Sequence, residues 1–213
     1  MNPSWALAAA GLGAGAGVAL WWRLRTGSYR RHDDVPRVAL GRLWLVIVMA
    51  AAGAAAASTL GLPLAVPAGI YLVVASALVW IDIDVHRVPD AVLAVLAPVL
   101  AAAVLAAAAA TGQWSLLGSA LAGAAGLGAV FLVLALVGSM GFGDVKLAAT
   151  TGIVVGPLGV DALFTTVLAG FLVAVIVGVA MLVRGAGRRA HLAFGPAVIA
   201  GAFIAIVRAG LGV

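Results

Sequence analysis

Residues 90–111 read DAVLAVLAPVLAAAVLAAAAAT, and after Asp90 this stretch carries no charged side chain. A helix needs about 20 apolar residues to cross the roughly 30 Å hydrocarbon core of a bilayer, so this stretch is long enough to span a membrane. Residues with turn propensity border it, Val88-Pro89 before it and Gly112-Gln113 after it. The stretch therefore predicts one membrane-spanning helix with defined ends.

The same length criterion finds eight candidate spans in the 213 residues. They cover residues 4–23, 42–61, 63–82, 90–111, 115–138, 144–158, 160–183 and 194–212. The composition agrees, because 65% hydrophobic and 9% charged residues leave too little polar surface for a water-soluble protein of this size. We predict an all-α, polytopic integral membrane protein with about eight transmembrane helices, forming a single membrane domain over residues 1–213. The sixth span is short, and Gly156-Pro157 is expected either to end it or to kink it.

Positive charge is distributed unequally between the two sides of this topology. Of the twelve Lys and Arg residues, eleven fall on one side and only Arg208 falls near the other. The eleven are Arg23, Arg25, Arg30, Arg31, Arg37, Arg42, Arg87, Lys146, Arg184, Arg188 and Arg189. Since Lys and Arg collect in cytoplasmic loops, both chain termini are predicted outside the cell membrane, with this side facing the cytoplasm. Because the positive residues collect on one side, we interpret the net charge of +5 as a result of membrane topology and of contact with membrane lipid, and not as a sign of nucleic-acid binding.

The acidic residues are seven aspartates, and the chain has no glutamate. They are Asp33, Asp34, Asp82, Asp84, Asp90, Asp144 and Asp161. A charge at membrane depth costs roughly 2.5–3.5 kcal/mol on insertion scales, so such a residue requires a functional reason. Gly141-Phe142-Gly143-Asp144 places one carboxylate after two glycines that leave room for a substrate backbone. Peptide hydrolysis by aspartates needs a second carboxyl group to share a proton, and Asp82, Asp84 and Asp90 are the candidates.

Structural interpretations of these acids remain open at this point. Asp90 follows Pro89 and is expected to be the N-cap of the fourth span, and Asp144 alone would fit a helix cap equally well. Asp82 or Asp84 could be an interfacial acid paired with Arg87. Asp33 and Asp34 fit a solvated, charge-balanced loop, and Asp161 lies on the outer side.

The basic residues beside the two motifs also have two interpretations. Arg87 and Lys146 could lower the pKa of the nearby carboxyl groups, or they could anchor helix ends at the lipid headgroups. A metal site is not expected, because no second ligand is spaced to join His86 and cysteine is absent.

Three segments together resemble the type IV prepilin peptidases, which are membrane aspartyl proteases of the GxGD class. Residues 80–90, WIDIDVHRVPD, resemble the family pattern IDxxxxxxPD/N, and residues 141–146, GFGDVK, match its GxGDxK element. Phe194-Gly195-Pro196 is similar to the FGP element near the family's C-terminus. The order of the motifs and the 62 positions between Asp82 and Asp144 also fit. The resemblance extends from about residue 63 to the end, which makes 63–213 the peptidase-like core and 1–62 an addition of N-terminal helices and a short cytoplasmic loop.

The resemblance implies an aspartic endopeptidase that cuts the leader of prepilins or pseudopilins at the cytoplasmic face of the inner membrane, without a metal or cofactor. Its catalytic residues would be Asp82 and Asp144, and Asp84 competes with Asp82 because a small register error would exchange them. Supporting or substrate-binding positions would be Gly141, Gly143, Lys146, Arg87 and Asp90. Many members also methylate the new N-terminus and carry a larger, cysteine-containing cytoplasmic domain. The loop from about 23 to 41 is short and has no cysteine, so we expect a peptidase without methyltransferase activity.

Two other classes of membrane protein share single features with this chain. Presenilins and signal peptide peptidases also use GxGD, but they rely on a Pro-Ala-Leu element where this chain has Phe194-Gly195-Pro196-Ala197. A small transporter or channel would also place acids in membrane helices, although it would be expected to hold them near the bilayer midplane. The aspartates of this chain are predicted at one membrane interface, which favours the peptidase.

Overall fold

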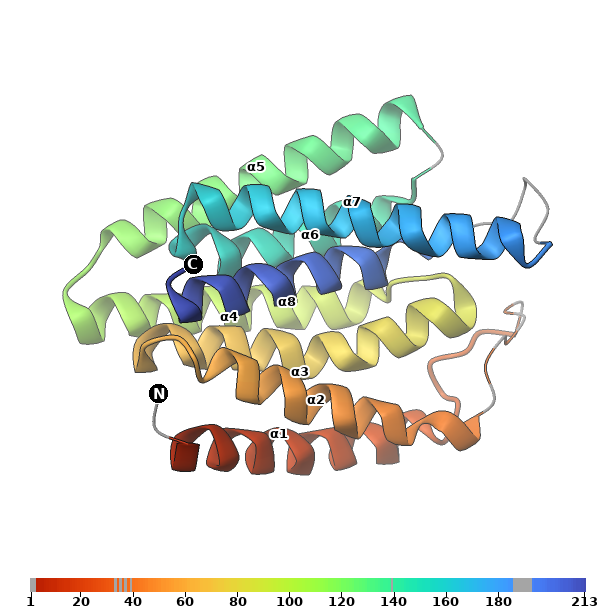
Figure 1. Cartoon of the computed structure of the whole chain (residues 1–213), viewed down its shortest axis with the longest axis horizontal. Helices are drawn as coiled ribbons and strands as arrows, with labels where there is room; N and C mark the ends of the chain where they lie inside the picture. Colours follow the sequence, from red (N-terminus) through yellow and green to blue (C-terminus); the bar gives the residue numbers. More distant parts are fainter. Residues whose placement is uncertain are drawn as a thin grey trace.

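The computed structural model describes residues 3–32, 34, 36, 38, 40–138, 140–185 and 193–213, and these residues form a helical bundle without strands (Figure 1). The elements are α1 (Pro3–Leu24), η1 (Leu40–Arg42), α2 (Trp44–Ala57), α3 (Leu62–Val85), α4 (Asp90–Thr111), α5 (Ser115–Val137), α6 (Phe142–Val155), η2 (Gly156–Leu158), α7 (Val160–Val183) and α8 (Gly195–Leu211). The predicted all-α, polytopic fold is confirmed. Asp33, Arg37, Arg188 and Arg189 of the sequence prediction lie outside the described residues.

Six helical segments in the described part are long and apolar enough to cross a membrane, and α6 and α8 are shorter. The α-helix α6 ends at Val155 and is followed by the single 3-10 turn η2, so the α-helix ends at Gly156-Pro157. With 14 residues, α6 is about 21 Å long at 1.5 Å per residue, which is less than the bilayer core. It contacts α3, α4, α5, α7 and α8, and its last residues, Val154 and Val155, are buried in protein, whereas Phe142 at its start is exposed.

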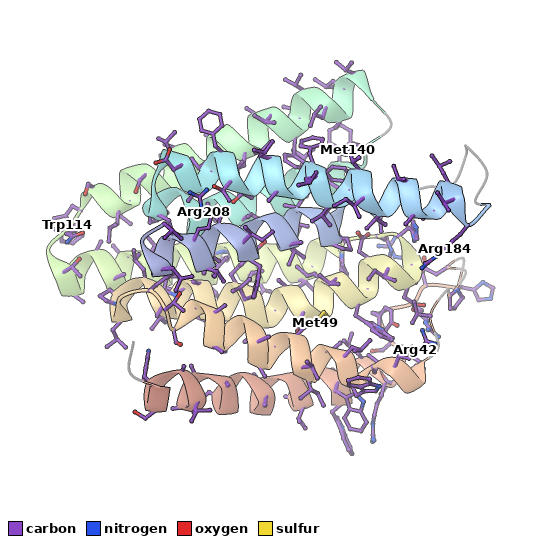
Figure 2. The ribbon with its side chains drawn as sticks, viewed as in Figure 1. Arg42, Met49, Trp114, Met140, Arg184 and Arg208 are labelled. Carbon is purple, nitrogen blue, oxygen red and sulfur yellow. The ribbon has the colours of Figure 1, made fainter. Side chains whose placement is uncertain are left out.

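The arrangement of the helices places all the functional motifs at one end of the bundle. In Figure 1, α1 lies along one edge and α8 runs through the middle, and the right-hand end holds the α3–α4 link together with the ends of α1, α5 and α7 and the starts of α2, α6 and α8. Arg42 and Arg184 lie at this end, whereas Trp114 lies at the opposite end (Figure 2). Arg208 donates to the Thr165 hydroxyl near the start of α7, away from the motif end.

A buried hydrogen bond joins the two helices that carry the aspartate motifs. The Tyr71 hydroxyl of α3 lies 2.8 Å from the Thr151 hydroxyl of α6, and Thr151 donates in turn to the Leu147 carbonyl. Tyr71 is therefore the donor of the inter-helix bond. Both side chains are fully buried, and Tyr71 belongs to the main hydrophobic cluster of the bundle. A satisfied polar contact in an apolar interior specifies one alignment of α3 against α6.

Glycines let α5 and α6 approach at backbone distance. A Cβ atom at Gly123 of α5 would lie 2.5 Å from the Gly152 carbonyl oxygen and 2.7 Å from the Gly156 Cα. Close backbone contact through small residues is a common way for helices to associate in membranes. This contact fixes the position of α6, which begins with the GxGD segment.

We expect Gly123→Ala to destabilise the protein, because the added methyl group meets backbone atoms that cannot rotate away. Overpacking of this kind typically costs about 1–3 kcal/mol. The check is thermal unfolding of the purified protein in detergent. Gly126→Ala is the matched control, since it lies in the same helix and its Cβ would meet nothing within 4 Å. Equal unfolding temperatures for the two variants would contradict the role of this contact.

Candidate active site

Asp82 lies in the last turn of α3, which continues to Val85 and so extends three residues beyond the predicted end of the third span. Its side chain is only 4% exposed. The carboxylate Oδ2 accepts a hydrogen bond of 3.0 Å from the backbone N–H of Gly195, the first residue of α8. A helix N-terminus presents free N–H groups and a partial positive charge, both of which suit a carboxylate. The FGP segment and the first aspartate motif therefore meet at Asp82.

Asp144 is the third residue of α6, after the N-cap Gly141, and it is half-buried. Its carboxyl group accepts a hydrogen bond from the Gly141 backbone, as an acidic residue does at this position of a capping box. It also lies close enough to Asp82 for the two carboxyl groups to interact electrostatically. Asp144 thus accepts a hydrogen bond at the start of its helix and also interacts with a second acid. The two interpretations of this residue, as a helix-capping group and as one of a pair of carboxyl groups, both apply.

The two aspartate motifs are in contact at further positions. A Cβ atom at Gly143 would lie 3.4 Å from the Val88 Cβ, so this glycine lets α6 pack against the α3–α4 link. Gly141 is exposed, and the nearest side-chain atom to its Cβ position is Asp144 Oδ2 at 3.9 Å. Of the two glycines, Gly141 is the one that leaves the space beside the Asp144 carboxyl open.

The remaining predicted supporting residues bind one another or the N-terminal loop. Lys146 forms an ion pair of 2.7 Å with Asp90, and both side chains are more than half exposed, which gives such a pair a small energetic value. Asp90 is the first residue of α4, whereas the N-cap is Pro89, so the expectation that Asp90 caps this helix was wrong. Arg87 pairs with Asp34 at 2.9 Å and with neither Asp82 nor Asp84.

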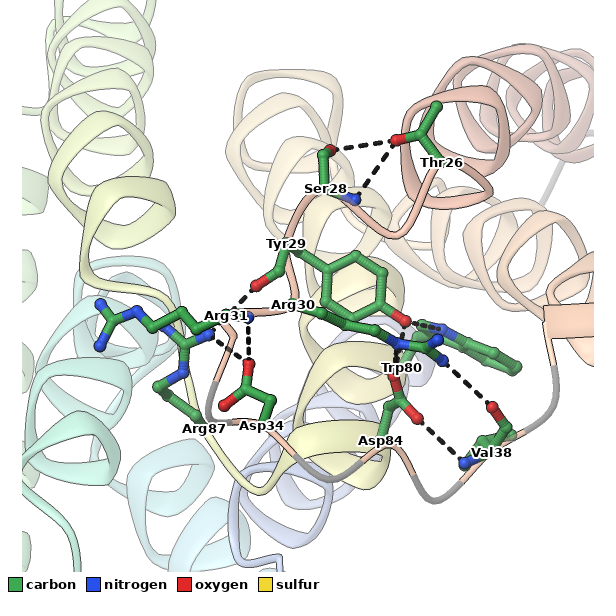
Figure 3. Close-up of polar contacts among 10 residues, drawn as sticks. All are labelled: Thr26, Ser28, Tyr29, Arg30, Arg31, Asp34, Val38, Trp80, Asp84 and Arg87. Atoms are coloured by element: carbon green, nitrogen blue, oxygen red, sulfur yellow. Dashed lines mark hydrogen bonds and ion pairs between the residues drawn. The ribbon is translucent and has the colours of Figure 1, made fainter.

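Asp84 faces the N-terminal loop (Figure 3). It is fully buried and accepts hydrogen bonds from the Tyr29 hydroxyl at 2.7 Å, the Arg30 Nε at 2.8 Å and the Val38 backbone N–H at 2.9 Å. Burial, followed by the hydrogen bond to Asp84, raises the pKa of Tyr29, and the hydrogen bond to Asp84 raises the pKa of Arg30. Both groups therefore keep their donor protons at neutral pH.

A second set of contacts holds the same loop. Asp34 accepts a hydrogen bond from the Arg31 backbone N–H, and this bond, with a smaller contribution from Arg87, lowers the pKa of Asp34. Arg87 also donates to the Tyr29 carbonyl, and the Trp80 indole donates to the Tyr29 hydroxyl at 3.1 Å. Asp34 is therefore an anchored residue and not a solvated one, and Trp80 is a buried side chain.

The charges near the site are distributed in a way that isolates the pair Asp82 and Asp144. Three cations close to the motifs, among the residues that the structure describes, bind other acids: Arg30 binds Asp84, Arg87 binds Asp34, and Lys146 binds Asp90. Within the described part of the chain no ion pair involves Asp82 or Asp144, and no three potential metal ligands cluster together. Two interacting carboxyl groups, one deeply and one partly buried, can share a proton and so provide an acid and a base side by side.

Comparison with known protein families decides the class to which this arrangement belongs. A family model described as the type IV leader peptidase family matches residues 69–183. The chain belongs to the type IV leader peptidase family. The matched region contains both aspartate motifs and ends before Phe194-Gly195-Pro196, and its family identifies the chain as a membrane peptidase of the leader-peptidase type. No curated protein and no solved structure matches the chain.

Some residues around the site of this leader peptidase were not predicted from the sequence. The FGP segment was recognised, but nothing in its spacing places the Gly195 amide on Asp82, 113 positions earlier in the chain. Tyr29, Arg30 and Val38 were assigned only to a polar loop. One signal was available, because Trp80 and Asp84 are four residues apart and so share a face of a helix that ends beside that loop.

Proposed function

We propose that this member of the type IV leader peptidase family is an aspartic endopeptidase that removes the leader from prepilins or pseudopilins at the cytoplasmic face of the inner membrane. The observation that carries the proposal is the interaction between the carboxyl groups of Asp82 and Asp144, while the nearby cations are paired with other acids. A cation bound to either carboxylate would hold it ionised and prevent the pair from sharing a proton.

The proposed reaction is a general acid–base hydrolysis by the two aspartates. The ionised carboxylate accepts a proton from water, whose oxygen attacks the scissile carbonyl carbon, and the protonated carboxyl group gives its proton to the carbonyl oxygen. In the tetrahedral intermediate that results, the carboxyl group that took the proton from water transfers it to the leaving nitrogen. The other carboxylate takes a proton from one hydroxyl group of the intermediate as the C–N bond breaks, which releases a carboxylic acid and an amine and restores the pair with one shared proton. The Gly195 N–H orients the Asp82 carboxyl group during both steps. The reaction needs no metal or cofactor.

The distribution of charge along the bundle supports cleavage on the cytoplasmic side. Arg42 and Arg184 lie at the end that holds the aspartate motifs, together with Arg87 and Lys146. Because positive residues collect on the cytoplasmic side, we orient this end toward the cytoplasm, with both chain termini on the opposite side. The substrate's apolar segment would then remain in the bilayer while its leader reaches the aspartates from the cytoplasm.

The proposal is tested by reconstituting the protein in liposomes with a candidate prepilin and measuring intact masses of the products. We expect two fragments that add up to the substrate plus water. With S-adenosylmethionine present, the new N-terminus should remain unmethylated, because the loop that precedes α2 is short and the chain has no cysteine. A substrate left intact under conditions where a known prepilin peptidase cleaves it would refute the proposed activity. A product heavier by one methyl group, formed only with this protein, would refute the absence of methyl transfer.

A further inference from the structure

The carboxylate of Asp84 holds a segment of the N-terminal loop that we call the strap, meaning the described residues between Ser28 and Val38. Three groups of the strap donate to this one carboxylate: the Tyr29 hydroxyl, the Arg30 guanidinium and the Val38 amide (Figure 3). Asp84 is fully buried, so its charge is stabilised by these donors rather than by water. The buried charge and the docked strap therefore depend on each other.

Asp84 and Asp82 point to different sides of the same helical turn. Residues two apart in a helix are separated by about 200° around its axis. On one side, Asp82 accepts the Gly195 N–H of α8, and on the other side Asp84 accepts the donors of the strap. The last turn of α3 is thus held between two sets of polar contacts, and a rotation of this turn would break both.

Contacts around Asp84 extend the docked surface beyond one side chain. Trp80, one turn earlier on α3, donates to the same Tyr29 hydroxyl that donates to Asp84. Just after the helix, Arg87 binds the Asp34 carboxylate and the Tyr29 carbonyl. Between them, His86 adopts a left-handed conformation with φ of 49°, where a non-glycine residue is strained. The strap therefore covers the helix end at which the chain turns toward the second aspartate motif.

We propose that Asp84 is a positioning residue, which docks the strap onto the end of α3 and thereby holds Asp82 in place relative to Asp144. This inference rests on the proposed function for its effect on rate, but the docking itself can be measured without substrate. The proposal gives the two neighbouring aspartates different roles: Asp82 takes part in the proton transfers, and Asp84 holds the helical turn that carries Asp82. It also gives the short N-terminal loop a part in the active site.

The test uses spin labels, which can be attached at single sites because the chain has no cysteine. One label at Ser28→Cys reports on the strap, and another at Ile83→Cys reports on the last turn of α3; both side chains are exposed. In Asp84→Asn we expect both labels to become more mobile by electron paramagnetic resonance.

For cleavage of a reconstituted prepilin, we expect Asp84→Asn to lower kcat by about 10- to 100-fold while KM stays within about 2-fold of the wild-type value, as for a small misplacement of a catalytic group. Asp161→Asn, an exposed acid at the far end of the bundle, should change neither readout.

Strap variants that keep Asp84 separate positioning from chemistry. Arg30→Met should mobilise both labels and lower kcat in parallel with Asp84→Asn, and Arg30→Lys should restore part of both. If Asp84→Asn lowers kcat while both labels stay immobile, Asp84 takes part in the chemistry and the proposal is overturned. If the strap label becomes mobile while the Ile83 label and kcat stay unchanged, the strap does not position α3 and the proposal is again overturned.

Failure of the proposed function would give a different result. If the wild-type protein leaves the prepilin intact, the peptidase assignment fails, but the label at Ile83 still tests whether Asp84 orders the end of α3. An Ile83 label that is equally immobile in the wild type, Asp84→Asn and Arg30→Met would reject the positioning role without reference to activity.

Discussion

Replacing Asp144 with Asn should abolish leader cleavage, and replacing Asp82 with Asn should do the same. An amide can neither accept the proton of the attacking water nor protonate the scissile carbonyl, and general acid–base catalysis of this kind contributes about 10²–10⁴-fold for each group. Because the two groups act as a unit, the double variant should be no slower than either single variant. The measurement is the initial rate of prepilin cleavage by the reconstituted proteins at equal concentration.

The control for both variants is Asp161→Asn, which removes an acid of the same type at the opposite end of the bundle and should retain wild-type activity. Asp84→Asn should fall between these extremes, because its effect is exerted through position. An Asp144→Asn protein that keeps a tenth of the wild-type rate would exclude Asp144 from the chemistry. If Asp84→Asn were as inactive as Asp144→Asn while Asp82→Asn remained active, the roles of the two neighbouring aspartates would be exchanged.

Gly195→Ala should cause the second large loss of activity. A Cβ atom at this position would lie 2.7 Å from Asp82 Oδ2 and 3.3 Å from Asp82 Cγ, so the carboxyl group must move away from the site it shares with the Gly195 amide. Leu147 of α6, with its Cδ2 3.4 Å from the same Cβ position, limits the space into which the residues could shift. We expect kcat to fall by about 10- to 100-fold, because a misplacement of a catalytic group by about 1 Å can lower the rate by about 100-fold.

The matched control for this variant is Gly178→Ala in α7, where an added Cβ would meet nothing within 4 Å. It should keep both the wild-type rate and the wild-type unfolding temperature. A Gly195→Ala protein that cleaves at the wild-type rate would show that the contact between α8 and Asp82 is not needed. If its rate fell only in proportion to a lower folded fraction, the effect would be on stability and not on the active site.

The helices could be predicted well from the sequence because the thickness of the bilayer sets a minimum length for each apolar span. The spans at 90–111 and 160–183 agree with α4 and α7 at both ends, and the short sixth span corresponds to α6 and η2. The third span was predicted to end at Asp82 because the polar residues begin there. In the protein the helix continues to Val85, since the strap satisfies Asp84 outside the lipid.

The site was only partly predictable, for reasons that concern tertiary contacts. Spacing could not choose between Asp82 and Asp84, because both lie in one helical turn and only their neighbours distinguish them. The pairing of Arg87 with Asp34 and of Lys146 with Asp90 also joins residues more than 50 positions apart. Local patterns instead suggested that Arg87 pairs with a motif aspartate and that Asp90 caps its helix, and neither contact forms.

The strap also bears on how small a working fragment of this peptidase can be made. The family match begins at residue 69, whereas the donors to Asp84 come from residues 29, 30 and 38. A fragment cut to the matched region would keep both aspartate motifs, yet it would leave a carboxylate in an apolar interior without its donors. The smallest fragment that can be expected to fold with an ordered active site therefore starts upstream of residue 29.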